Sequence, residues 1–342
     1  MARYIPKWYR RRKVRSRRQI YIISVLVIIV AAVVFIYSAN PFGRGEDEAA
    51  ETLIAPGTLA EREASPPAPV TEPESDLPEI APETISEPDP NVAGLIAEAM
   101  ACINSRPARI IEARDRLNEI LPMHQSRRQR EFVKEQLSQL ADKWLFSRTI
   151  FTQDRLCKSL QVNPGDQLRA IGRQFKVPYE ILMQINNIDR PEALQAGETI
   201  KVISGPFHAR IYRSTFTMDL YLQNTFVRSF PVGLGQPGRE TPTGLWVVEP
   251  GGKLISPTWT DPDTGKTYEA GDKDYPLGSR WIGLKGISGA AKDRTGFAIH
   301  GTKKPEEIGT AGSRGCIRLH NGDVILLYNL LMEGFSQVEI VE

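Results

Sequence analysis

The feature that most restricts this sequence is an uncharged, apolar run of 20 residues at positions 20–39. An α-helix of this length spans the hydrocarbon core of a bilayer, which is about 30 Å thick. Positions 1–18 carry nine Lys and Arg residues and no acidic residue, and basic residues mark the cytoplasmic side of a membrane span. We therefore predict a basic cytoplasmic tail (1–19), a transmembrane helix (20–39) and export of everything after it. A cleaved signal peptide would have a shorter apolar region and a small-residue cleavage site, which fit this run less well.

Charge is segregated along the rest of the chain. Residues 40–91 hold thirteen acidic residues, two Arg and ten Pro, a composition that cannot bury enough apolar surface to fold. We expect a disordered, self-repelling linker that acts as a tether. Residues 92–342 hold 32 basic and 28 acidic residues. This balance argues against nucleic acid as a partner, because such proteins present a basic face.

The chain contains three cysteines, Cys102, Cys157 and Cys316. An exported chain meets an oxidising compartment in which disulfides persist, but an odd number leaves at least one thiol free. Two interpretations stay open for Cys102 and Cys157: a disulfide between them, or two ordinary buried thiols. In either case Cys316 is the free thiol.

Two small modules are predicted before the last third of the chain. Apolar residues recur at helical spacing in three stretches of residues 92–150, which predicts a small helical segment for packing or protein contact. Residues 160–204 begin and end with short β-forming stretches that enclose two helical patterns. Between them, Asp166 is placed to cap the first helix. The string from Val162 to Leu168 and the apolar positions up to Val202 resemble a LysM module, which implies a βααβ fold and binding to glycan strands of peptidoglycan.

Residues 206–342 are predicted to be mainly β-structure. Apolar and polar residues alternate from Phe216 to Leu222, which is typical of a half-buried strand. Gln223 and Asn224 suit a hairpin turn. One late helix is expected from Asp323 to about Glu333, capped by Asn321, with a last strand after it.

Two short segments of this domain carry the chemistry. His300 follows the apolar residues 297–299, and Cys316 follows a glycine 16 residues later. A cysteine attacks as the thiolate, which a neighbouring base or cation favours. His300 can serve as that base, and Arg314 and Arg318 are close enough in sequence to lower the pKa of the thiol. Taken alone, one Cys and one His are weak evidence, because a lone Cys in a β-domain is usually a buried small hydrophobe.

The full strings are more specific. His-Gly-Thr at 300–302, Ser-Arg-Gly-Cys-Ile-Arg-Leu at 313–319 and Pro-Val-Gly at 231–233 are similar to the signature of the YkuD-type L,D-transpeptidase family. The resemblance implies an enzyme that cross-links the stem peptides of peptidoglycan. It matches Cys316 to the nucleophile, His300 to the base, Gly301 to the carbonyl that orients the imidazole, and Ser313 and Gly315 to the oxyanion loop.

The same resemblance implies three substrate-binding residues: Arg314, Arg318 and Trp259. Arg314 departs from the pattern, because many members have a histidine there; an arginine stays protonated and suits an electrostatic or carboxylate-binding role. His124 and His208 are expected to be surface residues. His320 is expected to be exposed or to support a residue of the site, and not to act as a catalytic partner of Cys316. Asp261, Asp263, Asp272 and Asp274 lack the order of an EF-hand, so we predict a solvated loop near the cleft, with no metal and no cofactor.

Three alternatives are weighed. An L,D-carboxypeptidase would use the same groups with water as the acceptor. Wall endopeptidases of the Cys/His type place the cysteine before the histidine, whereas here His300 precedes Cys316. A non-catalytic wall anchor would have lost the Cys or the His, and both are present. The chain is thus predicted to be a single-pass cell-membrane protein with its carboxy-terminal domains outside the membrane.

Overall fold

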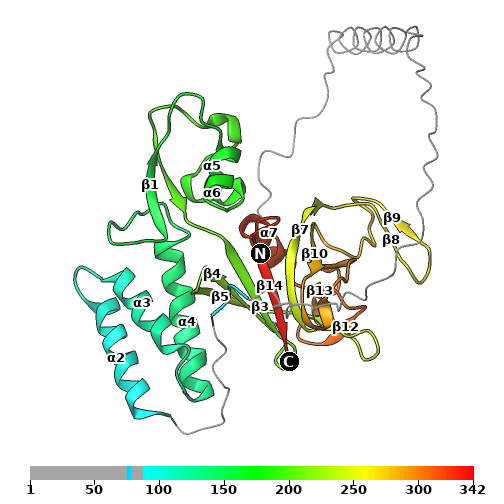
Figure 1. The fold of residues 1–342 in the computed structure, drawn as a ribbon, viewed down its shortest axis with the longest axis horizontal. Coiled ribbons are helices and arrows are strands. Elements are labelled where there is room, and N and C mark those ends of the chain that lie inside the picture. The colour runs from blue at the N-terminus through cyan, green and yellow to red at the C-terminus, as the bar shows by residue number, and fades with distance from the viewer. Residues whose placement is uncertain (1–74, 79–87) are drawn as a thin grey trace, which may run out of the picture. The chain divides into compact units, whose positions relative to one another are not determined.

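A computed structural model describes residues 75–78 and 88–342 of the chain (Figure 1). The predicted transmembrane helix (20–39) and most of the predicted linker lie outside these residues. Within the described part, no helix is both long and apolar enough to cross a bilayer. Residues 75–78 belong to the predicted linker but contact the folded body: Leu77 is buried, and Gln337 donates to Asp76 while accepting from its backbone N–H.

The helical segment has the three predicted helices: α2 (Pro90–Asn104), α3 (Ile110–Ile120) and α4 (Arg127–Trp144). Helix α4 begins with a capping box, in which Ser126 and Gln129 each bond the other's backbone. Helices α3 and α4 contact the edge strand of the large sheet described below. The Asn118 side chain accepts from Phe226 N–H on that strand (2.8 Å). This contact protects an otherwise unpaired strand edge.

The LysM region has the predicted βααβ order: β1 (Cys157–Gln161), α5 (Leu168–Gln174), α6 (Tyr179–Asn186) and β2 (Thr199–Ile203), with β1 and β2 antiparallel. The expected cap was wrong. Gln167 occupies the N-cap position of α5 and makes no side-chain cap. Asp166 instead accepts from the backbone N–H of Asn163 (2.8 Å) and closes the preceding turn.

A buried lysine fastens the LysM region to the helical segment. Lys201 of β2 is fully buried. Its Nζ donates to four carbonyls at the carboxyl end of α4 and in the residues that follow it: Trp144 (2.5 Å), Leu145 (3.3 Å), Ser147 (2.8 Å) and Thr149 (2.8 Å). The last carbonyls of a helix have no partner within it and carry partial negative charge. A cation at this point therefore satisfies several of them at once.

The carboxy-terminal domain is built on one eight-stranded mixed sheet with the order β13-β11-β10-β7-β14-β3-β4-β5, which curls around its core. The pairs β11/β13 and β14/β3 are parallel, and the other neighbours are antiparallel. The strands are β3 (Phe207–Tyr212), β4 (Thr217–Leu222), β5 (Thr225–Pro231), β7 (Gly244–Ile255), β10 (Arg280–Gly286), β11 (Phe297–His300), β13 (Ile317–Arg318) and β14 (Gln337–Val341).

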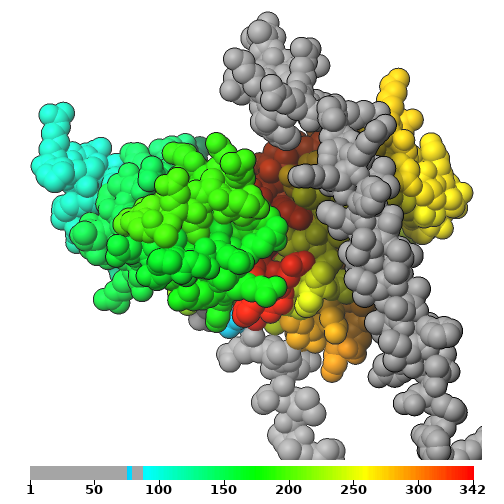
Figure 2. All heavy atoms as spheres, turned by 90° about the horizontal axis from the view of Figure 1, so that it is seen from above, coloured from blue at the N-terminus to red at the C-terminus, as the bar shows by residue number. Residues whose placement is uncertain are grey.

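Shorter elements surround this sheet. Strand β6 (Leu234–Gly235) pairs with β12 (Ala311–Ser313), and β8 (Trp259–Thr260) with β9 (Thr267–Tyr268). The β8–β9 hairpin extends from the body of the domain (Figure 1), and in the space-filling view its yellow segment projects from the surface (Figure 2). The predicted late helix is present as α7 (Asn321–Leu330).

Two local expectations in this domain were wrong, and one choice left open earlier in the chain is now decided. Asn321 does not cap α7; its side chain instead bonds both the N–H and the carbonyl of Thr302 (3.1 and 3.0 Å). His208 is not a surface residue: it is buried in β3 and its Nδ1 accepts from the backbone N–H of Gln337 (3.1 Å). The sequence left open whether Cys102 and Cys157 form a disulfide or are two separate buried thiols. In the structure both are free and buried.

Candidate active site

His300 and Cys316 are brought together by a parallel strand pair. His300 ends β11 and is paired with Arg318 of β13, so the two side chains leave the same face of the sheet. Cys316 lies two residues before Arg318, and the period of two along an extended chain puts it on that face as well. All three side chains line one cleft of about 630 Å³.

The imidazole of His300 is held on two sides. Its Nδ1 lies 2.6 Å from the carbonyl oxygen of Gly301, which fixes Nδ1 as the protonated nitrogen and leaves Nε2 as the acceptor. The indole of Trp281, opposite His300 on the neighbouring strand β10, stacks on the ring. His300 is only 5% exposed, and burial lowers its pKa to about 4, against the smaller raising effect of the Gly301 hydrogen bond. The ring is therefore neutral at pH 7.

The thiol of Cys316 is half-buried and free. Its Sγ lies 4.0 Å from the carbonyl oxygen of Gly296. Burial raises the pKa of the thiol above its ordinary value of 9.0, although the Ala298 backbone and the charge of Arg318 act in the opposite direction. The predicted lowering effect of a nearby arginine is present for Arg318, but burial outweighs it. In the free protein the thiol and the imidazole are therefore both neutral at pH 7.

The loop before Cys316 is held by side-chain hydroxyls. Ser313 Oγ donates to the Cys316 carbonyl (2.6 Å) and accepts from the N–H of Gly315 (3.1 Å), while Thr241 donates to the Gly315 carbonyl (2.9 Å). Gly315 adopts φ +112°, and a Cβ there would lie 2.7 Å from the ring of Phe297. Because the Gly315 N–H is already bonded, the amide of Cys316 is the better candidate for stabilising an oxyanion.

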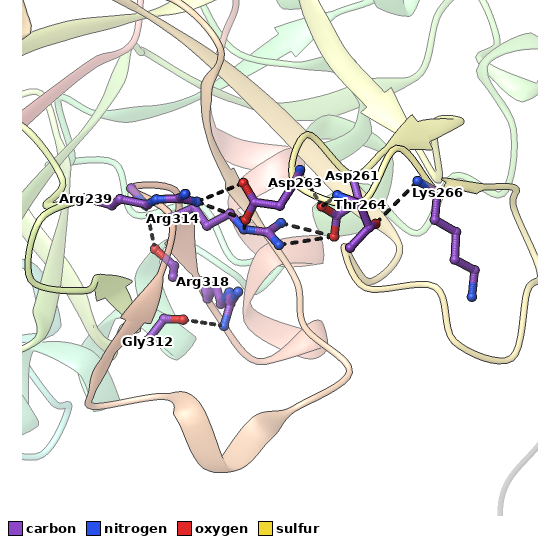
Figure 3. Close-up of polar contacts among 10 residues, drawn as sticks. Arg239, Asp261, Asp263, Thr264, Lys266, Gly312, Arg314 and Arg318 are labelled. Carbon is purple, nitrogen blue, oxygen red and sulfur yellow. Dashed lines mark hydrogen bonds and ion pairs between the residues drawn. The ribbon is translucent and has the colours of Figure 1, made fainter.

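The two arginines expected to bind substrate both hold carboxylates of this chain. Arg314 contacts Asp261 (3.2 Å) and Asp263 (2.7 Å) on the turn of the β8–β9 hairpin. Figure 3 shows Arg239 beside Arg314, reaching the same Asp263. Arg318 pairs with Glu307 and lies apart from this network. The loop expected to be merely solvated is thus tied to the catalytic loop.

Other lining residues were foreseen only in part. Trp259, expected near the substrate, lines the cleft and stacks on Tyr268 of the same hairpin (6.0 Å between centroids). His320 is exposed. Trp281 and Arg239, which also line the cleft, and Thr241, which bonds the Gly315 carbonyl, were not predicted from the sequence. Among the residues with described positions, no group of three or more His, Cys, Asp or Glu could hold a metal ion.

Comparisons with known proteins identify two domains of the chain. Residues 206–340 match the YkuD family, described as the L,D-transpeptidase catalytic domain, and residues 160–202 match the LysM domain. The chain is 30% identical over 186 residues to the putative L,D-transpeptidase YkuD of Bacillus subtilis, which covers 51% of this chain and 93% of that protein. It is 31% identical over 200 residues to the probable L,D-transpeptidase ErfK/SrfK of Escherichia coli, covering 55% of this chain and 56% of that protein. A solved L,D-transpeptidase from Mycobacterium smegmatis aligns with a TM-score of 0.31 at 13% identity, over 43% of this chain and 64% of that one.

The fold and the sequence together define a cysteine-based transpeptidase with a LysM domain. The chain belongs to the YkuD-type L,D-transpeptidase family.

Proposed function

We propose that this enzyme cross-links peptidoglycan stem peptides through a thioester on Cys316. Nε2 of His300 takes the thiol proton as Sγ attacks the carbonyl carbon of the diamino acid, in its bond to the terminal D-alanine of a tetrapeptide stem. The oxyanion formed accepts from the backbone N–H of Cys316. His300 then returns the proton to the leaving amine, and D-alanine departs.

In the second half of the reaction, the side-chain amine of another stem attacks the thioester carbonyl. His300 accepts the proton that this amine loses and gives it back to the sulfur. One amide bond forms, the C–S bond breaks and the free thiol is restored. If water replaces the amine, the same groups give an L,D-carboxypeptidase, which is the second candidate.

The observation that carries this proposal is the shared face of β11 and β13. It puts the fixed imidazole and the half-buried thiol in one open cleft, next to a loop whose backbone is held by Ser313 and Thr241. A non-catalytic scaffold would not need an imidazole and a free thiol in one accessible cleft.

The test is intact mass spectrometry of the full-length chain in detergent, incubated with a disaccharide-tetrapeptide. We expect an adduct on Cys316 that lacks one D-alanine, followed by a cross-linked dimer. Free tripeptide without dimer would favour hydrolysis. Cys316→Ala should form neither product, and Cys157→Ala is the control, because Cys157 is a buried thiol outside the cleft. Product from Cys316→Ala would overturn the assignment of the nucleophile.

Two further roles complete the proposal. Residues 20–39 anchor the chain in the cytoplasmic membrane and residues 40–74 let the enzyme reach the wall; deletion of 1–39 should move the protein from the membrane fraction to the soluble fraction. The LysM domain binds glycan strands, which a sedimentation assay with purified peptidoglycan checks. Retention of Cys316→Ala on peptidoglycan would show that binding does not need the catalytic thiol.

A further inference from the structure

Two guanidinium groups converge on a single carboxylate in the cleft (Figure 3). Nη1 of Arg239 lies 3.2 and 3.0 Å from the two carboxylate oxygens of Asp263. Nε of Arg314 lies 2.7 Å from one of the same oxygens. Charged forks placed on both oxygens of a carboxylate are the usual way in which proteins recognise that group.

One arginine of this pair, Arg314, lies on the same loop as the reacting sulfur. Arg314 precedes Cys316 by two residues, which is at most about 7 Å of extended chain. Arg239, Arg314 and Cys316 line the same cleft. A carboxylate bound between the two arginines would thus belong to a part of the substrate near the bond that is cut.

The carboxylate now in place comes from a residue that can leave. The Asp263 side chain is 41% exposed, and exposed ion pairs add little stability. Asp261 differs: its side chain is 13% exposed and accepts from the backbone N–H groups of Asp263 and Thr264 (2.9 and 3.2 Å). Asp261 therefore holds the turn and keeps Arg314 oriented, whereas the bond of Asp263 to the arginine pair can be exchanged.

We propose that Arg239 and Arg314 form a subsite for the terminal carboxylate of the donor stem peptide, and that Asp263 fills this subsite in the free enzyme. The inference rests on the proposed function. The terminal carboxylate is attached, through one carbon, to the nitrogen of the bond that Cys316 breaks. Binding it beside Arg314 orients the scissile carbonyl toward the sulfur. The carboxylate leaves with the released amino acid, and Asp263 returns.

The subsite also selects the donor. A stem peptide with one more residue has an amide in place of this carboxylate. Its own carboxylate lies one residue further from the scissile bond, out of register with the arginine pair, and Asp263 stays in place. The side chains of Arg239 and Arg314 are partly exposed (48% and 37%), so losing the ion pair should weaken binding of the amide rather than abolish it.

The test measures the rate of Cys316 acylation in the full-length chain with two donors: a disaccharide-tetrapeptide with a free terminal carboxylate and its terminal carboxamide. Wild type should have a KM about tenfold or more lower for the acid. Arg239→Gln should remove this preference by raising the KM for the acid, with kcat little changed, and Arg239→Lys should restore part of it. Asp263→Asn should lower the KM for the acid and leave the KM for the carboxamide unchanged.

Matched controls are Arg213→Gln, which alters an arginine paired with Glu342 at the surface, and Asp293→Asn, which alters an exposed aspartate outside the cleft. Neither should change the preference. If Arg239→Gln, folded by circular dichroism, keeps the wild-type preference for the acid, the subsite proposal is overturned while the proposed function stands. If wild type forms no adduct with either donor, the proposed function falls, and the subsite falls with it.

Discussion

The indole ring of Trp281 lies parallel to the imidazole of His300, with the ring centroids 5.6 Å apart and the planes 10° apart. The two residues are directly paired on neighbouring antiparallel strands. An aromatic face favours a cation placed over it. In the proposed reaction, this stack would stabilise the imidazolium that forms as His300 takes the thiol proton, a charge that burial disfavours.

Trp281→Leu should accordingly slow acylation of Cys316. A cation–π contact contributes about 0.5–2 kcal/mol, so the expected loss is roughly 2- to 30-fold at pH 7. Trp281→Phe, which keeps an aromatic face, should lose less. An NMR titration of His300 should show a lower pKa in Trp281→Leu than in wild type. An unchanged titration with reduced activity would mean that Trp281 acts by packing alone.

The reactivity of Cys316 should rise with pH and show no plateau near neutrality. Its pKa is raised above 9.0 by burial, and that of His300 is lowered to about 4, so no thiolate–imidazolium pair is present between these values. Iodoacetamide should alkylate Cys316 slowly at pH 7 and faster above pH 9, more slowly at each pH than a model thiol. Peptide mass spectrometry measures the rates. A plateau of fast alkylation between pH 5 and 7 would indicate a preformed ion pair and contradict the neutral resting state.

Gly315→Ala should abolish acylation. The added Cβ would lie 2.7 Å from the ring of Phe297, at a φ of +112° that side chains rarely adopt. Such strain costs about 1–3 kcal/mol and would shift the peptide that precedes the nucleophile. The comparison is Gly322→Ala, at which a Cβ meets nothing within 4 Å; it should acylate normally. Full activity in Gly315→Ala would show that the loop tolerates rearrangement.

Lys201→Met should lower the free energy of unfolding by about 3 kcal/mol or more, because it leaves the buried carbonyls around α4 without their donor. Lys158→Met, on the exposed face of the neighbouring strand β1, should change it by about 0.5 kcal/mol or less. Urea denaturation followed by circular dichroism gives both values. Equal effects of the two substitutions would mean that Lys201 is not a structural tie between the LysM region and the helical segment.

Much of the architecture could be predicted from local patterns. Helical spacing gave three helices before residue 150, and alternation gave the strand and hairpin around Gln223. The βααβ order of residues 160–204 followed from its turn and apolar positions. What failed were single polar side chains. Asp166 and Asn321 were expected to cap helices because Asp and Asn favour that position, but Asp166 bonds Asn163 within its own turn and Asn321 bonds Thr302 in another loop.

By itself, the sequence determined which segments are helix or strand, the presence of a LysM domain and a transpeptidase domain, and the residue types able to perform acyl transfer, because these depend on spacing along the chain. Only the tertiary structure decided what surrounds those residues. In the fold, Trp281 stacks on His300, 19 positions away, and Arg314 pairs with Asp263, 51 positions away. Burial also raises the pKa of the Cys316 thiol. Burial and charge pairing arise from segments distant in the sequence, and no local pattern encodes their distances.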